Sequence, residues 1–272
     1  MISIIRYTLM SVLVLALCQP PGAWAHKRWL LPSDFTLSDS ETVTVDFTAS
    51  NNVFYVDKGM PLRDVEVLAP NGEPLELLRA VEGDRRSSFD LSVAQRGTHR
   101  VVVQSPPVYF LSYRLAEARE PVIQRGALTA LRAAVPEDAQ DVQFMASSSR
   151  IETFITLGNP TPPPVLDDAD GLSLQFPSHP NRLYQDESAT FTLSFRGEPV
   201  AGAIVTVIAD GSRYRDGLEE RVFQSDENGS VTIDWPAPGR YLLEAALERN
   251  APDTSVSRLH HGYFLTLEVL AP

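Results

Sequence analysis

The chain has almost no cysteine, and its one residue of this type, Cys18, lies in an apolar segment near the start. Without a second cysteine the chain cannot close an internal disulfide, and removal of the first 25 residues would leave it without any thiolate. A metal ion bound by the remaining residues must therefore be held by nitrogen and oxygen ligands.

Positive charge is also scarce. The chain has 23 Lys and Arg residues against 35 Asp and Glu residues, a formal net charge of −12, and no run of basic residues. An acidic chain of this kind is repelled by nucleic acids and by anionic membrane surfaces. We therefore expect no nucleic-acid partner.

Motifs for the common catalytic chemistries are missing. The chain contains no Gly-x-Ser-x-Gly, no phosphate-binding loop, no His-Glu-x-x-His and no dinucleotide fingerprint. The sequence therefore predicts a protein that is not an enzyme.

The first residues are typical of an export signal. A short segment with one positive charge, Arg6, precedes the apolar residues 7–17, and the small-x-small pattern Ala23-Trp24-Ala25 predicts cleavage after Ala25. The apolar run is shorter than the about 20 residues that span a bilayer, so we expect a periplasmic or secreted protein without a transmembrane helix in the mature chain. In an alternative interpretation, residues 15–18 resemble a lipoprotein signal, and Cys18 becomes the acylated terminus.

Beyond this segment the sequence predicts an all-β fold. Apolar and polar residues alternate in short runs separated by turn residues, as in residues 42–47, where Val43, Val45 and Phe47 would share one face. Residues 26–157 are predicted to form an N-terminal β-sandwich domain, in which Pro106-Pro107 should end a strand. The proline-rich residues 158–170 are predicted to form a linker, and residues 171–272 are predicted to form a C-terminal immunoglobulin-like β-sandwich domain.

One stretch has a helical period. Apolar residues recur at three to five positions through residues 122–135, and Pro136 follows them. The sequence therefore predicts one short helix near 122–135, in the first domain.

Several short motifs, in this order and spacing, resemble the family of exported bacterial proteins known as domain of unknown function 4198. They are Ala25-His26 with Trp29 and Pro32, residues 150–154 (Arg-Ile-Glu-Thr-Phe), His179-Pro180-Asn181, Tyr214-Arg215-Asp216, and Trp235 through Tyr241. Members are often labelled periplasmic components of nickel or cobalt uptake, so the resemblance implies a metal-related binding role. Residues 199–203 and 226–229 also resemble carboxypeptidase-regulatory or prealbumin-like sandwiches.

The strongest candidate metal ligand is His26, because cleavage after Ala25 would give it a free α-amine beside its imidazole. These two nitrogens can chelate a borderline transition metal. His179 is the second candidate: it lies just after the linker and could meet His26 where the domains join, or it could simply hold the junction by hydrogen bonds to the backbone.

Three further residues are weaker metal candidates. His260 and His261 are neighbours in a strand, so their side chains should point to opposite faces and only one of them could serve a given site. Glu152 could orient a histidine ligand, or it could form a same-face ion pair with Arg150.

These features favour a non-catalytic periplasmic protein that binds nickel, cobalt or copper and passes the ion to a membrane uptake transporter. A secreted copper-dependent monooxygenase that uses an N-terminal histidine is one alternative. A structural or adhesive β-sandwich module, in which His26 has no role, is the other.

Overall fold

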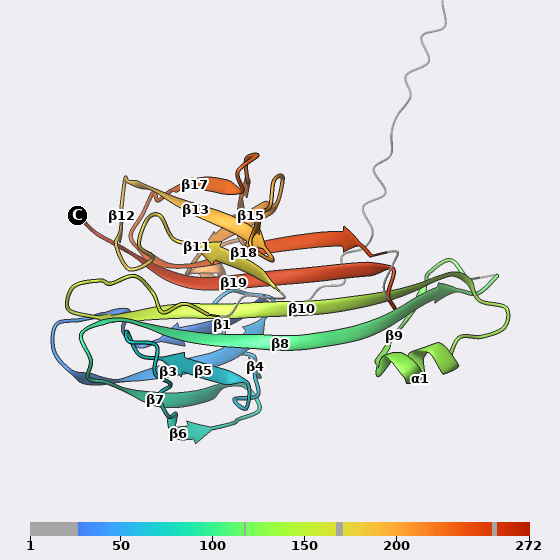
Figure 1. Cartoon of the computed structure of the whole chain (residues 1–272), viewed down its shortest axis with the longest axis horizontal. Coiled ribbons are helices and arrows are strands. Elements are labelled where there is room, and N and C mark those ends of the chain that lie inside the picture. Colours follow the sequence, from blue (N-terminus) through green and yellow to red (C-terminus); the bar gives the residue numbers. More distant parts are fainter. Residues whose placement is uncertain (1–26, 117, 167–170, 252–254) are drawn as a thin grey trace, which may run out of the picture.

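The computed structural model describes residues 27–116, 118–166, 171–251 and 255–272. These residues form three β-sheets stacked as layers, with a long middle sheet between two smaller ones (Figure 1). The all-β fold predicted from the alternating pattern is confirmed. His26 lies outside the described residues.

The lower sheet in Figure 1 is antiparallel and begins with the first described strand. Its strands, in spatial order, are β1 (Lys27–Pro32), β3 (Glu41–Ser50), β7 (Ser87–Val93) and β6 (Leu78–Val81), with β4 (Lys58–Gly59) paired to β3. The predicted alternation in β3 is confirmed, because Val43, Val45 and Phe47 are all buried. This face of the lower sheet covers one side of the middle sheet.

The middle sheet combines strands from both halves of the chain. Its main path is β16 (Arg221–Gln224), β15 (Ile204–Ala209), β18 (Gly239–Asn250), β19 (Arg258–Leu270), β10 (Gln140–Leu157), β8 (Gly97–Arg114) and β5 (Val65–Leu68). Three short strands pair at its margins: β12 (Leu183–Tyr184) with β19, β2 (Thr36–Leu37) with β10, and β9 (Val122–Gly126) with β8. The halves meet where β10 and β19 pair in parallel, from Met145↔Arg258 to Thr153↔Thr266.

The upper sheet closes the second sandwich. It contains β11 (Leu172–Gln175), β13 (Ser188–Phe195), β14 (Glu198–Pro199) and β17 (Ser230–Asp234). A single turn of 3₁₀-helix, η1 (Ser212–Tyr214), follows β15. The two sandwiches predicted over residues 26–157 and 171–272 thus share one sheet.

Side chains of the middle sheet enter two separate cores because successive residues in a strand face opposite ways. In β19, Phe264 packs into the lower core with Trp29 and Ile151. Its neighbours Tyr263 and Leu265 pack into the upper core. One sheet therefore supplies apolar residues to both sandwiches.

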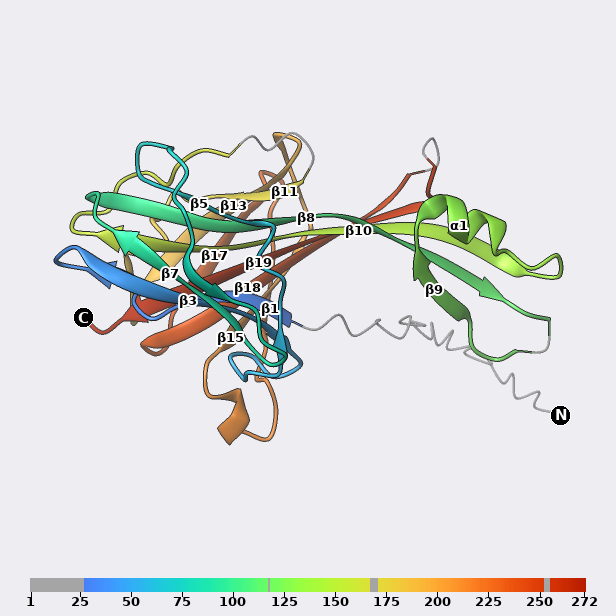
Figure 2. The ribbon, with the colours of Figure 1, turned by 90° about the horizontal axis from the view of Figure 1, so that it is seen from below.

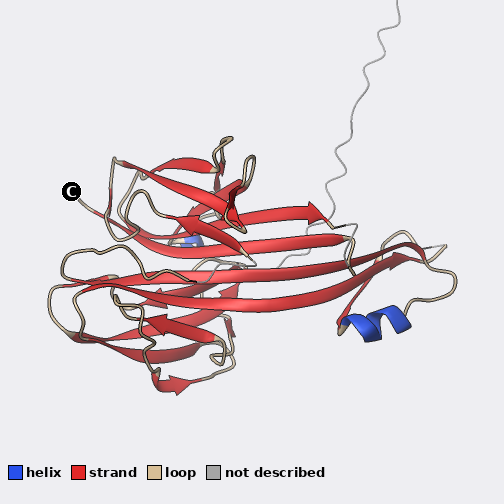
Figure 3. Ribbon diagram, in the orientation of Figure 1, coloured by secondary structure: helices blue, strands red, loops and turns tan. Residues whose placement is uncertain are grey.

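The outer halves of β8 and β10 extend beyond the sandwiches as an arm (Figure 2). The arm also carries β9 and α1 (Leu128–Ala133), the α-helix drawn in blue in Figure 3. The prediction of a helix over residues 122–135 is wrong in its first part, since Val122–Gly126 pairs with β8. Leu131 packs against Leu111 and Tyr113, so burial against the long strand β8 decides where the helix lies.

Candidate functional site

The arm leaves the sandwiches at an irregularity between β8 and β10. Ser149 pairs with Ser105, but Ser147 pairs with Val108, so β8 has one residue more than β10 between these pairs. We call residues 105–108 together with residues 147–149 the serine bulge. Bulges of this kind are frequent next to functional sites because they redirect side chains locally.

The extra residue belongs to Pro106-Pro107, and the expectation that these prolines end a strand is wrong. β8 continues through them to Arg114. Proline cannot donate a hydrogen bond to a neighbouring strand, but it is tolerated at a bulge, where the regular pairing is interrupted. Neither proline has a partner in the register of the two strands.

His260 and His261 lie beside the serine bulge on β19. They are in register with Ser147 and Ser148 of β10, and each imidazole pairs with the adjacent serine. The Nδ1 atom of His260 lies 3.2 Å from the Ser147 hydroxyl, and that of His261 lies 2.7 Å from the Ser148 hydroxyl. The two side chains lie on opposite faces, as predicted.

His261 is enclosed on the upper face. Its ring lies 4.7 Å from that of Phe195, and its Nε2 atom is buried without a hydrogen-bond partner among the described residues. Burial lowers the pKa of His261, and the neighbouring charges of His260, Arg196 and Arg249 lower it further. Burial therefore favours the neutral form of the imidazole, which packs against the Phe195 ring.

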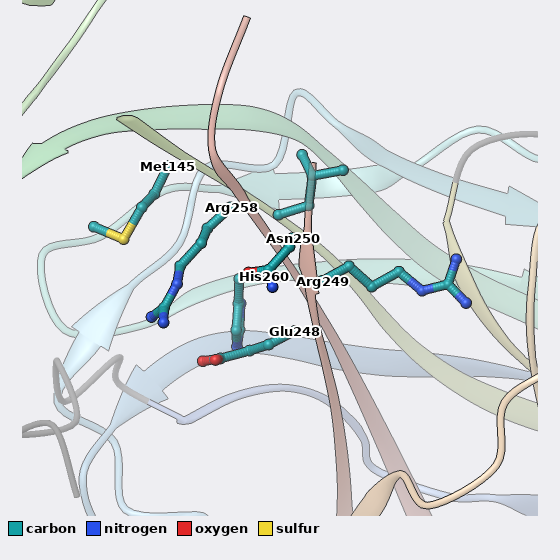
Figure 4. Close-up of a pocket in the computed structure, with 7 residues that line it drawn as sticks. Met145, Glu248, Arg249, Asn250, Arg258 and His260 are labelled. Atoms are coloured by element: carbon teal, nitrogen blue, oxygen red, sulfur yellow. The ribbon is translucent and has the colours of Figure 1, made fainter. Parts of the chain in front are cut away.

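His260 faces a pocket of about 230 Å³ on the other side of the sheet (Figure 4). Glu248 of β18 is its direct cross-strand partner, and Figure 4 shows the two side chains running side by side while Arg249 points away. The other lining residues are Met145, Arg249, Asn250, Arg258 and Leu259. An imidazole and a carboxylate, both suitable metal ligands, thus share one face.

The start of β1 lies near this face. Arg28 stacks over the Phe264 ring at 5.2 Å and lines a second pocket together with Ser147, the residue that contacts His260. Lys27 forms ion pairs with Glu220 at 3.1 Å and Glu244 at 2.9 Å. Burial alone would lower the pKa of Lys27, but the two carboxylates outweigh it and raise the pKa.

His179 is held by hydrogen bonds through both ring nitrogens. Nδ1 accepts from the Asn181 backbone N–H at 3.1 Å, so the ring proton is on Nε2, which donates to the Thr161 carbonyl at 2.9 Å. The Thr98 hydroxyl lies 3.1 Å from Nε2, and burial lowers the pKa of His179. No lone pair of this imidazole is left for a metal ion.

The structure also separates His179 from the start of β1. Arg28 lies level with Ser147–Ser149 of β10, whereas His179 lies beside Thr98, which is in register with Thr156 at the far end of that strand. Seven residues of extended chain span roughly 23 Å. Because His26 lies outside the described residues, its predicted meeting with His179 stays a prediction.

Glu152 is buried at 1% exposure between two arginines. Its carboxylate lies 3.4 Å from Arg100 and 3.5 Å from Arg150, which confirms the expected ion pair within β10. Tyr263 is buried beside this cluster; burial first, and then the charge of Glu152, raise the pKa of its hydroxyl. The arrangement ties β8, β10 and β19 together.

No group of three or more His, Cys, Asp or Glu side chains in the described part of the chain is arranged to hold a metal ion. Within the same residues, no helix is both long and apolar enough to cross a membrane. Of the predicted ligands that the structure describes, only His260 combines an accessible position with a neighbouring acid.

A family model described as "Domain of unknown function (DUF4198)" matches residues 23–249. The chain belongs to this family. The resemblance found from the short motifs is therefore confirmed at the level of the family. The curated proteins that were compared with the chain include no match.

Solved structures with related features come from several kinds of protein. The D0-D1 domain of intimin is 12% identical, with 88% of this chain and 96% of that one covered and a TM-score of 0.22. The Escherichia coli adhesin FdeC is 13% identical, with 90% and 65% covered and a TM-score of 0.22. The FN1-FN3 domains of chicken CNTN1 are 7% identical, with 89% and 98% covered and a TM-score of 0.23. Scores this low carry no argument about function.

Sequence reasoning missed Glu248 and the serine bulge. Three consecutive serines opposite Ser-Pro-Pro, in strands that are otherwise largely apolar, are the signal that could have drawn attention to residues 147–149. Glu248 had no local signal, because its pairing with His260 depends on the register of β18 and β19.

Proposed function

We propose that this DUF4198 chain is an exported, non-catalytic protein that binds a divalent transition metal ion, nickel, cobalt or copper. His260 and Glu248 would be the ligands within the folded sheet, and His26 would add its amine and imidazole after cleavage of the signal. The ion would then be passed to a membrane uptake transporter.

The observation that carries this proposal is the cross-strand pair of His260 and Glu248 beside the start of β1. Residues directly opposite in antiparallel strands have Cβ atoms about 4.5–5.5 Å apart, which allows both side chains to reach one ion. Arg28 is already close to Ser147, the hydrogen-bond partner of His260. The predicted terminal residue precedes this point by two positions.

The orientation of His260 supports a ligand role. Metal-binding histidines generally use their second ring nitrogen in a hydrogen bond that fixes the ring. The contact between Nδ1 and the Ser147 hydroxyl has this form and leaves Nε2 to bind. Because binding at His26 would require its imidazole and amine to be neutral, metal affinity should fall as the pH drops below about 6.5.

Arg258 opposes the binding of a cation, because it lines the same pocket as Glu248 and His260. Its charge raises the free energy of a metal ion held there. Replacing Arg258 with glutamine should therefore strengthen metal binding, which separates a site at this pocket from one elsewhere in the chain.

Calorimetric titration with nickel, cobalt and copper at pH 7.5 tests the proposal. We expect His260→Ala and Glu248→Gln each to weaken binding by about tenfold or more. Glu227→Gln, an exposed acid in a distant turn, is the matched control and should bind as the parent does. Unchanged affinity in His260→Ala would exclude this site.

Two further measurements separate the alternatives. Mass spectrometry of the exported protein establishes whether it begins at His26, and any other first residue removes the amine ligand. Oxygen consumption by the copper-loaded protein with a reductant, above that of free copper, would favour the monooxygenase.

A further inference from the structure

A second pocket lies on the lower face of the serine bulge and is lined by cations and hydroxyl groups. It has a volume of about 240 Å³, and its charged lining residues are Arg28, Lys58 and Arg125. Its other lining residues are Ala49, Met60, Ser105, Val108, Phe110 and Ser147–Ser149. No acidic side chain lines this pocket, although the chain as a whole has a net charge of −12.

Arg28 is half-buried and has no ion pair with any described carboxylate. The adjacent Lys27 forms ion pairs with both nearby acids, Glu220 and Glu244. Burial lowers the pKa of Arg28, Glu244 partly reverses this, and the like charge of Arg125 lowers the pKa again. A guanidinium nevertheless stays protonated in a protein, so Arg28 keeps a positive charge at the wall of a pocket that no acidic side chain lines.

The other two cations of the pocket are also without an acidic partner within the described residues: neither Lys58 nor Arg125 forms an ion pair there. Lys58 and Arg125 are exposed and Arg28 is half-buried, and like charges that line one pocket repel one another. An anion bound between them would offset this repulsion.

The serine bulge adds neutral hydrogen-bond donors. Ser149 is 7% exposed, and the part of the chain that is described provides no hydrogen-bond partner for its hydroxyl. Ser105 lies opposite Ser149 in the register of β8 and β10 and lines the same pocket. Guanidinium groups with nearby hydroxyl donors are the arrangement that recognises the oxygen atoms of phosphate, sulfate or carboxylate groups.

We propose that this pocket binds a small anion through an oxyanion or carboxylate group, with Arg28 and Arg125 as its main charged contacts and Ser149 as a donor. The pocket is smaller than the roughly 300–1,000 Å³ of sites for drug-sized ligands, so the ligand is a small ion or acid. The proposal uses none of the metal ligands and stands whether or not a metal is bound.

Calorimetric titration of the protein expressed from the full sequence, after removal of metals on a chelating resin, tests this site. The probes are sulfate, inorganic phosphate and succinate, at an ionic strength kept constant with chloride. We expect saturable binding of one anion per chain by at least one probe. Binding of sulfate or phosphate alone assigns an inorganic-type oxyanion, and binding of succinate alone assigns a carboxylate.

Arg28→Gln and Arg125→Gln should each lower the affinity by about 10- to 100-fold, because each removes a charge-assisted hydrogen bond. Arg63→Gln is the matched control, since the Arg63 side chain is exposed and lies outside the pocket lining. Ser149→Ala, which removes only a hydroxyl, provides a variant that keeps every charge and should weaken binding less.

Absence of saturable binding by all three probes would overturn the proposal. Equal affinity in the parent, Arg28→Gln and Arg125→Gln would overturn it as well, because the anion would then bind elsewhere. The two proposals can fail separately. Arg28→Gln and Arg125→Gln keep the metal ligands His260 and Glu248, and His260→Ala keeps all three cations of the anion pocket.

Discussion

Replacing Glu152 with glutamine should strongly destabilise the fold without affecting metal binding. Glu152 is the carboxylate between Arg100 and Arg150, and all three side chains are almost completely buried. Glutamine keeps the shape but removes the negative charge, so two buried guanidinium groups would face each other without the charge of Glu152 between them. The Arg100 guanidinium also lies over the Phe154 ring at 5.2 Å, which holds it inside the upper core.

Removing one partner of a buried ion pair costs about 3–5 kcal/mol of unfolding free energy. For a chain of this size 1 kcal/mol shifts Tm by about 2–4 °C, so Glu152→Gln should lower Tm by roughly 6–20 °C. Mutations at exposed sites away from such features usually change stability by less than about 0.5 kcal/mol. The effect is therefore well outside that of an ordinary surface change.

Urea unfolding followed by circular dichroism measures this loss, with Glu227→Gln as the exposed control. A double-mutant cycle with Arg100→Met measures the interaction free energy between Glu152 and Arg100, because that change removes one of the two positive charges. A loss below about 1 kcal/mol in Glu152→Gln would refute the view that the carboxylate neutralises the arginines. A changed metal affinity would instead favour the alternative in which Glu152 orients a histidine ligand.

Three other results follow from the structure. Asn181→Ala should lower the free energy of unfolding by about 1–3 kcal/mol, because the Asn181 side-chain amide donates to the Phe35 and Phe154 carbonyls in the interior. Urea unfolding measures this loss. His179→Ala should lower Tm but leave nickel affinity unchanged in titrations, since both ring nitrogens are already bonded. Stability should fall as the pH drops below about 6.5, because the lowered pKa values of His179 and His261 let the unfolded chain bind more protons than the folded one; unfolding at pH 7.5 and 5.5 tests this.

Local patterns predicted several features of the sheet correctly. The alternation of β3 places Val43, Val45 and Phe47 in the core, and the same period of two puts His260 and His261 on opposite faces. These features depend only on the geometry of one extended strand, so they can be derived without knowing which strands are neighbours.

Other features were mispredicted because pairing partners overrode local preference. Residues 122–126 have a helical period, but they form an edge strand on β8. Two consecutive prolines normally end a strand, because proline has no N–H group to donate to a neighbouring strand. At the bulge Pro106 and Pro107 have no partner in β10, so no such hydrogen bond is required of them. In the first place the competing influence is pairing with the preceding strand β8, and in the second it is the shift in register between β8 and β10.

The sequence by itself determined the all-β class, the family and the scarcity of thiolate and basic groups, because composition, motifs and strand periodicity are local properties. Only the tertiary structure decided that β10 and β19 pair in parallel, which joins the two sandwiches through one sheet. The same pairing brings His260 beside Ser147 and places Arg28 at the serine bulge. These contacts depend on the register between strands more than a hundred residues apart, which no single segment encodes.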